Sequence, residues 1–337
     1  HYRTCNICEA MCGIEIRHRG EEILSIKPDP ADPFSRGHIC PKAVALQDFY
    51  HDPERLKKPL RKIPGGWEEI SWEAAFAEIG ARMRGIQAEY GPHSVGAYMG
   101  NPNAHNLGNA IFLPQFFKAL GSKQRFSSAS ADQLPHHVAA NYMFGAGMSI
   151  SVPDINRTDY MLIIGGNPVV SNGSMMSAAG MPGRIKAIQQ RGGKVVVIDP
   201  RRTETAKIAS EHLFIRPEKD ALLLLAMIHT LIADDRVQLR HLQAITDGFE
   251  QVKSAAAAFS PEAVAEAVGI SAGKIRQLTH EFASAPSAVC YSRMGASTQS
   301  FGGLCQWLTL VLNIISGNFD RVGGAMFPQP AFDLLAG

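Results

Sequence analysis

Several features that define common protein classes are missing from these 337 residues. No apolar run reaches the roughly 20 residues of a membrane span, and the nearest one, residues 222–232, has the length of a buried helix. Lys and Arg number 33 against 31 Asp and Glu, a net charge of +2, which does not predict the strongly basic surface of a nucleic-acid-binding protein. We therefore expect no nucleic-acid partner and no direct membrane insertion.

A secretion signal is also missing, because neither a basic leader nor a small-residue cleavage site precedes the first cysteine. We expect a cytoplasmic protein, or a periplasmic one if a targeting segment before His1 has been removed.

Cysteine is absent over most of the chain, between Cys40 and Cys290. Four of the six cysteines lie in the first 40 residues, whereas Cys290 and Cys305 stand alone in apolar surroundings. A chain of this size does not need a disulfide framework. We predict a metal or cluster site near the N-terminus and two buried core thiols later in the chain.

The N-terminal cysteines follow the pattern Cys-x2-Cys-x3-Cys-x27-Cys-Pro, with Cys5, Cys8, Cys12 and Cys40. One loop can place three thiolates around a compact inorganic core while a distant cysteine supplies the fourth, as iron–sulfur clusters require. Structural zinc sites usually use two separate pairs of ligands. The pattern favours a [4Fe–4S] cluster over zinc or unliganded thiols.

The chain length and the order of apolar segments predict an α/β fold: a small iron–sulfur N-terminal domain followed by two αβα layered, doubly wound, Rossmann-like domains. We place the domains at residues 1–58, 59–127 and 128–337. In the first, residues 13–28 alternate like a hairpin. The expected helices are 71–91, 106–120, 180–193, 219–234 and 302–316, and the expected buried strands are 94–100, 159–168, 194–202, 212–217 and 287–295.

Small and polar residues follow two of these strands, in GGNP at 165–168 and DPRR at 199–202. Ligands of doubly wound sheets bind at the carboxyl ends of the strands, where backbone N–H groups favour phosphate. Arg201 and Arg202 can donate to an anionic dinucleotide, and Asp199 can accept from ribose or guanine. Alone, GGNP can also be only a tight turn, because it lacks the G-x-G-x-x-G pattern.

Taken together, CNICEAMCG with GHICPK, TDYMLIIGGNP with KVVVIDPRRTETA, and SRMGASTQSFGG resemble the molybdenum or tungsten bis-(pyranopterin guanine dinucleotide) oxidoreductases, the dimethyl-sulfoxide-reductase family. The three matches occur in the family's order and cover essentially the whole chain. Within that family, the sequence resembles formate-dehydrogenase-like catalytic subunits.

The resemblance assigns roles to individual residues. It implies that Cys5, Cys8, Cys12 and Cys40 ligate the cluster and that Lys42 lies between cluster and pterin. The residues that match positions holding the guanine dinucleotide are Gly166, Asn167, Asp199, Arg201 and Asp220. Those that match the pterin-lining segments are Met294, Gly295 and Gln299.

The resemblance also places a metal ligand in residues 126–145. Counting back from Phe144 and Gly145 puts Asp132 at the ligand position, and no cysteine is available there. A carboxylate oxygen suits oxidised molybdenum. Ser130 is the alternative if the register shifts by two, and a site without a protein ligand is another. Asp132 can instead be the N-cap of the following helix.

The family's formate dehydrogenases pair a cysteine or selenocysteine ligand with an adjacent histidine and a later arginine. Here Gln133 is the neighbour of Asp132, and residues 323–331, which match the arginine region, contain no arginine. Formate chemistry is therefore in doubt. The candidate catalytic residues are Asp132, Gln133 and Lys42. His136 and His137, one turn later, are more typical of packing or surface positions.

The leading hypothesis is a redox enzyme that oxidises or reduces a small substrate by two electrons at molybdenum or tungsten. The expected cofactors are the bis-(pyranopterin guanine dinucleotide) metal centre and a [4Fe–4S] cluster, which passes electrons to a protein or redox subunit. One alternative is a cluster-bearing structural or electron-transfer subunit that has lost the metal cofactor. The other is a non-redox tungsten hydratase, in which the resemblance implies a cysteine ligand.

Relatives in this family are longer than 337 residues. We expect that the rest of the second domain and a last domain lie outside this sequence, that apolar surface is exposed as a result, and that the piece alone is inactive.

Overall fold

The computed structural model describes residues 1–329. Residues 330–337, which include the end of segment 323–331, lie outside the described part. The chain divides into two compact units, residues 1–128 and 129–337, and each is described by itself. No helix in the described range is long and apolar enough to cross a membrane.

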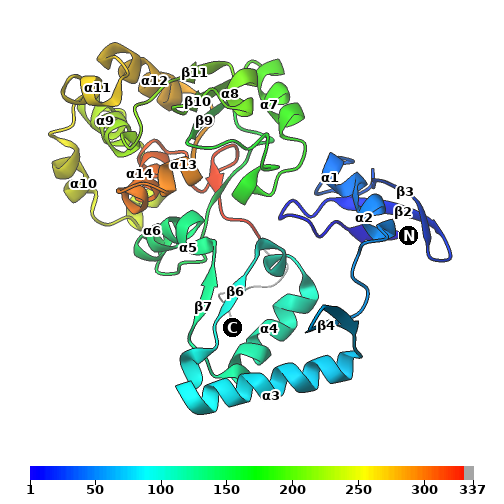
Figure 1. The fold of residues 1–337 in the computed structure, drawn as a ribbon. Helices are drawn as coiled ribbons and strands as arrows, with labels where there is room; N and C mark the ends of the chain where they lie inside the picture. The colour runs from blue at the N-terminus through cyan, green and yellow to red at the C-terminus, as the bar shows by residue number, and fades with distance from the viewer. Residues whose placement is uncertain (330–337) are drawn as a thin grey trace. The chain divides into compact units, whose positions relative to one another are not determined.

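Unit 1 begins with a three-stranded antiparallel sheet in the order β1-β2-β3 (Figure 1). The predicted hairpin at 13–28 is confirmed as β2 and β3, which turn at Gly20 with a positive φ of 56°. Two short helices follow, and then a hairpin of β4 and β5. The bounds are β1 Tyr2–Thr4, β2 Gly13–Arg19, β3 Glu22–Pro28, α1 Pro41–Val44, α2 Leu46–His51, β4 Leu60–Ile63 and β5 Gly66–Glu69.

The rest of unit 1 contains two long helices and a parallel strand pair: α3 Trp72–Tyr90, β6 Ala97–Met99, α4 Leu107–Leu120 and β7 Arg125–Ser127. Ser71 is the predicted N-cap of α3, and its Oγ accepts a hydrogen bond of 3.1 Å from the backbone N of Ala74. The prediction that residues 94–100 form a buried strand is wrong. Only three residues pair, and Tyr98 is 72% exposed, because β6 and β7 form a two-stranded sheet that leaves its side chains uncovered.

Helices α3 and α4 also expose large apolar side chains. Those with more than two fifths of their surface exposed include Trp72, Phe76, Ile79, Phe112 and Phe116.

Unit 2 is built around a four-stranded sheet in the order β11-β10-β9-β12, in which every neighbouring pair is parallel. The predicted apolar runs form these strands, and every residue of β9 and β12 is buried. Figure 1 shows α7 on one side of the sheet and α9, α10 and α11 on the other. The strand bounds are β8 Val152–Pro153, β9 Tyr160–Ile164, β10 Lys194–Ile198, β11 Glu211–Leu213, β12 Ala288–Ser292 and β13 Ala325–Met326.

The helices of unit 2 cover this sheet and confirm the predicted helical segments. Helix α9 contains the apolar run 222–232 and is almost wholly buried. Cys290 on β12 and Cys305 on α14 are buried core thiols, as predicted. The helices are α5 Ala129–Asp132, α6 Leu134–Phe144, α7 Met181–Gln190, α8 Glu204–Ile208, α9 Asp220–Ala233, α10 Phe249–Ala256, α11 Pro261–Val268, α12 Ala272–Ser284, α13 Met294–Ser297 and α14 Gly302–Ile315.

The strand order reverses between β9 and β12. From β9 the chain proceeds to β10 and β11 on one side, then returns to form β12 on the other. Ligands of such sheets bind beyond the carboxyl ends of the strands at this switch point. There the backbones of Gly165 and Gly295 touch: the Gly295 N donates to the Gly165 O at 2.9 Å. A Cβ on Gly295 would lie 2.9 Å from the Gly165 Cα.

We predict that Gly295→Ala destabilises unit 2 by about 1–3 kcal/mol, because the added methyl group meets backbone that cannot rotate away. The matched control is Gly273→Ala on α12, where a Cβ meets nothing within 4 Å, so its effect should stay within about 0.5 kcal/mol. Denaturant unfolding followed by Trp307 emission, with Trp67 and Trp72 changed to Phe, measures both. Equal stabilities of the two variants would refute the close-approach argument.

Candidate functional site

The four N-terminal cysteines lie on neighbouring segments of unit 1. Cys5 follows β1 and Cys12 precedes β2, and because these strands pair, the Cys5 N donates to the Cys12 O at 2.8 Å. Cys40 is the N-cap residue of α1. The loop before Cys40 is fastened to the same strand through Asp32, whose Oδ2 accepts from the Gly13 N at 3.1 Å.

The electrostatics of these thiols fit a cluster site. Burial, together with the neighbouring Cys5, Cys8 and Cys40, raises the pKa of Cys12 to about 11. Burial likewise raises the pKa of Cys5, and the neighbouring Cys8 and Cys40 add to this increase. Thiols that influence one another in this way need a bound cationic core to stay deprotonated. In the described range, no three His, Cys, Asp or Glu side chains are grouped as ligands of a single metal ion.

Lys42, predicted to act beside the cluster, is an exposed residue of α1.

The predicted dinucleotide residues gather at the carboxyl edge of the sheet in unit 2. Gly166 and Asn167 follow β9, and the Asn167 amide bridges to α8: its Nδ2 donates to Glu204 at 2.7 Å, and its Oδ1 accepts from the Thr205 hydroxyl at 2.7 Å. Arg201 follows β10 and is exposed, with its Nη2 at 3.5 Å from Glu204. Both segments therefore present polar groups at the edge where a ligand would bind.

Two acidic residues at this edge are shielded from solvent by burial. Burial raises the pKa of Asp199, which follows β10, although its Oδ1 accepts from the Arg201 N at 2.8 Å. Burial also raises the pKa of Asp220, the first residue of α9, and the charge of Asp199 adds to this. Gln299 donates from Nε2 to Asp220 at 2.8 Å, whereas its own Oε1 is buried without a partner.

A buried acceptor without a partner is rare in a folded protein, so the Gln299 Oε1 is a position at which a donor from a ligand would fit. Met294, also predicted to line the cofactor, begins α13 and is 55% exposed. The residues present fit a dinucleotide-bearing group at this edge.

Asp132 and Gln133 lie at the junction of α5 and α6. The interpretation of Asp132 as a helix N-cap is wrong, because α6 begins after Gln133, which makes no side-chain cap. Instead the Asp132 Oδ1 accepts from Nη2 of Arg293 at 2.7 Å. No partner of the Asp132 Oδ2 is found among the described residues. Ser130, the alternative ligand, lies two residues earlier in α5.

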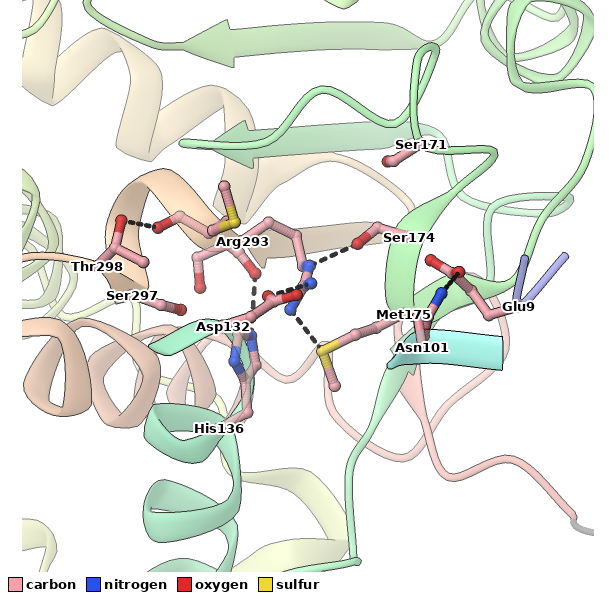
Figure 2. Close-up of polar contacts among 12 residues, drawn as sticks. Glu9, Asn101, Asp132, His136, Ser171, Ser174, Met175, Arg293, Ser297 and Thr298 are labelled. Carbon is pink, nitrogen blue, oxygen red and sulfur yellow. Dashed lines mark hydrogen bonds and ion pairs between the residues drawn. The ribbon is translucent and has the colours of Figure 1, made fainter. Parts of the chain in front are cut away.

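Arg293 is the residue that sequence reasoning missed. It directly follows β12 and is only 6% exposed. Figure 2 shows its guanidinium between Ser174, Met175 and Asp132, to which it donates at 2.7 Å in each case. An arginine placed directly after an apolar strand was the signal available in the sequence.

His136 lies beside this group on α6. Burial, together with the positive charge of Arg293, lowers its pKa to about 4. Its Nε2 lies 3.3 Å from the Ser292 carbonyl oxygen, while Nδ1 is buried without a partner. Since the carbonyl can only accept, we assign the proton to Nε2 and leave Nδ1 as an acceptor. His136 also lines a cavity of about 40 Å³, large enough for water.

His137, by contrast, is turned toward Gly147, with its Nδ1 2.8 Å from that carbonyl oxygen.

We predict that His136 makes the protein less stable as the pH falls from about 6.5 to about 4. In that range the unfolded chain binds a proton that the folded chain excludes, at a cost of about 3 kcal/mol overall. His136→Gln removes this contribution and should flatten the pH dependence of the free energy of unfolding relative to the wild type. Parallel curves for the two proteins would show that His136 is not held neutral.

Comparison with known proteins agrees with this geometry. The profile of the molybdopterin oxidoreductase family matches residues 55–283, and that of the molybdopterin oxidoreductase Fe4S4 domain matches residues 3–52, which contain all four N-terminal thiols. The cofactors predicted from the sequence, a [4Fe–4S] cluster and a molybdenum- or tungsten-pterin, are the groups to which these two domains correspond.

Individual relatives cover nearly the whole chain. The molybdopterin-containing subunit PhsA of thiosulfate reductase from Salmonella typhimurium is 29% identical over 99% of this chain and 43% of its own length. Formate dehydrogenase H of Escherichia coli is 27% identical over 96% of this chain and 46% of its own. The solved structure of acetylene hydratase from Pelobacter acetylenicus has a TM-score of 0.82, with 26% identity, over 98% of this chain and 45% of that one.

The chain thus spans less than half the length of these relatives. Its mixed α/β fold with an N-terminal iron–sulfur domain is that of the solved relative. The match over residues 55–283 covers most of the chain, and the chain belongs to the molybdopterin oxidoreductase family.

Proposed function

We propose that this chain supplies the [4Fe–4S] domain, the metal-ligand segment and one guanine-dinucleotide site of a molybdenum or tungsten oxidoreductase. The enzyme would oxidise or reduce a small substrate by two electrons and exchange these electrons with a partner protein or redox subunit through the cluster. The observation that carries the proposal is the set of unfilled polar positions at the switch point of the unit 2 sheet. These are the Oδ2 of Asp132 and the Oε1 of Gln299.

The dinucleotide would be held by the strand-end residues of this edge. Asp199 and Asp220 offer carboxylate acceptors for guanine or ribose, and Arg201 offers a cation for phosphate. Gly166 and Gly295 allow backbone to approach the group closely. The amide of Gln299, oriented by Asp220, presents its oxygen to the same group.

Asp132 would be the protein ligand of the metal. Arg293 holds one carboxylate oxygen, so the other is the atom left for coordination. A neutral His136 next to Arg293 adds no second positive charge to this region. When bound, the metal and its pterins supply the two-electron chemistry, while these side chains orient the ligand and set the local charge.

A second candidate is non-redox hydration, which the likeness to acetylene hydratase favours, since that protein is related both in sequence, at 28% identity, and in structure. Electron paramagnetic resonance during substrate titration separates the two functions. A redox enzyme changes the oxidation state of its metal on addition of substrate, whereas a hydratase does not. The third hypothesis is a subunit that has lost the metal cofactor. Detection of molybdenum or tungsten in the purified full-length protein would refute it.

We predict that Cys5→Ser, Cys8→Ser, Cys12→Ser and Cys40→Ser each abolish the cluster, because each removes one of its four thiolates. Iron analysis of the full-length protein should fall from about four atoms per chain to near zero, together with the cluster's paramagnetic signal. Cys305→Ala is the matched control, since its thiol is buried in the core of unit 2. Loss of iron in the control alone, or its retention in all four serine variants, contradicts the assignment.

We predict that Asp132→Ala and Asp132→Asn remove one light-atom ligand from the metal, seen by X-ray absorption at the metal edge. Ser130→Ala, two residues away on α5, should leave the spectrum unchanged. Asp132→Ala also leaves the Arg293 charge buried without its partner, which costs about 3–5 kcal/mol, so Asp132→Asn serves as the milder substitution. Unchanged metal spectra in both Asp132 variants would refute the ligand assignment.

A further inference from the structure

Arg293 is set apart from every other cation of the described residues by its burial. Among the Lys and Arg side chains of residues 1–329, it alone is buried. Its position is fixed by the backbone, because the Arg293 N donates to the Ile164 O at 3.1 Å. This places the guanidinium at the switch point between β9 and β12, where the fold binds ligands.

The hydrogen bonds of Arg293 are fewer and weaker than a buried guanidinium usually has. Its five N–H groups make three hydrogen bonds, to the Ser174 hydroxyl, the Met175 thioether and one oxygen of Asp132. A thioether sulfur is a weak acceptor, and the carboxylate pairs through a single oxygen although guanidinium is suited to bidentate pairing. Two N–H groups have no partner among the described residues.

The charge balance of this site depends on Asp132. Asp132 is the sole carboxylate among the partners of Arg293, and His136 is held neutral beside it. In the proposed function, the Asp132 carboxylate coordinates a metal cation, and the positive charge of the metal offsets its negative charge. The Arg293 charge is then left with only a hydroxyl and a thioether as other acceptors, and a buried charge in that state requires an anion.

We propose that Arg293 is a substrate-binding residue that makes the active site selective for a small oxyanion, either a carboxylate or an inorganic oxyanion, over a neutral molecule. This proposal rests on the proposed function, because it takes Asp132 as the metal ligand. The N–H groups of Arg293 without a protein partner donate to the oxyanion. The arginine that is missing from residues 323–331 is thereby supplied by a different segment, at the end of β12.

The test is calorimetric binding to the full-length, cofactor-loaded protein at constant ionic strength. Sodium formate and sodium nitrate are the anionic probes, and formamide is the neutral counterpart of formate. The variants are Arg293→Gln, which removes the charge, and Arg293→Lys, which keeps the charge but loses the planar fork. The matched control is Arg276→Gln, which removes a surface arginine paired with Glu262 at 2.6 Å.

We expect the wild type to bind at least one anion at least tenfold more tightly than it binds formamide. Arg293→Gln should weaken that binding at least tenfold, with Arg293→Lys between the two, and Arg276→Gln should stay within twofold of the wild type. Binding by a folded Arg293→Gln within twofold of the wild type overturns the proposal. So does a wild type that binds neither anion more tightly than formamide, a result that does not depend on any variant folding.

Metal analysis and X-ray absorption of the Asp132 variants distinguish failure of this proposal from failure of the proposed function, in which Asp132 is the metal ligand. An unchanged metal site in both Asp132→Ala and Asp132→Asn, together with lost anion binding in Arg293→Gln, refutes the ligand assignment and supports the role of Arg293. A changed metal site in the Asp132 variants, with unchanged anion binding in Arg293→Gln, supports the ligand assignment and refutes the role of Arg293.

Discussion

The contact between the backbones of Gly165 and Gly295 is the constraint on which the rest of unit 2 depends. It sets how closely the ends of β9 and β12 approach, and therefore where the residue after each strand points. Arg293 is buried because it lies at this crossing, and Asp132 is held because Arg293 is there to hold it. A side chain on either glycine would move the polar edge of the sheet as a whole, and with it the acids after β10 and at the start of α9.

The candidate sites of the two units have opposite electrostatic properties. In unit 1, neighbouring thiols resist ionisation until a cationic core offsets their mutual repulsion. In unit 2, a buried guanidinium is already ionised and lacks full compensation. The thiols of unit 1 therefore fit a positively charged inorganic group, whereas the proposed ligand of Arg293 in unit 2 is an anion. This division of charge corresponds to the division of roles expected between electron transfer and substrate conversion.

The sequence predicted those parts of the fold that depend on local pattern. Apolar runs located β9, β10 and β12, and Ser71 and Gly91 marked the ends of α3, because caps and buried strands are encoded by adjacent residues. It did not predict that β6 is exposed, since this depends on which strands cover it. It also did not identify Arg293, whose partners are Ser174 and Asp132, because contacts between residues distant in the chain leave no periodic signal. Asp132 was found by resemblance, yet its interaction with Arg293 instead of a capping role appeared only in the structure.

The separation of Asp132 and Arg293 by 161 residues has a consequence for the order of assembly. The four thiols lie within the first 40 residues, in the loop between β1 and β2 and at the N-cap of α1, and contacts between residues this near in the sequence form quickly. The Asp132–Arg293 pair can form only after β12 has inserted beside β9, which requires nearly the whole chain. During synthesis, the cysteine loop is therefore complete well before Asp132 meets Arg293, so the proposed metal ligand reaches its final position only after β12 has been made.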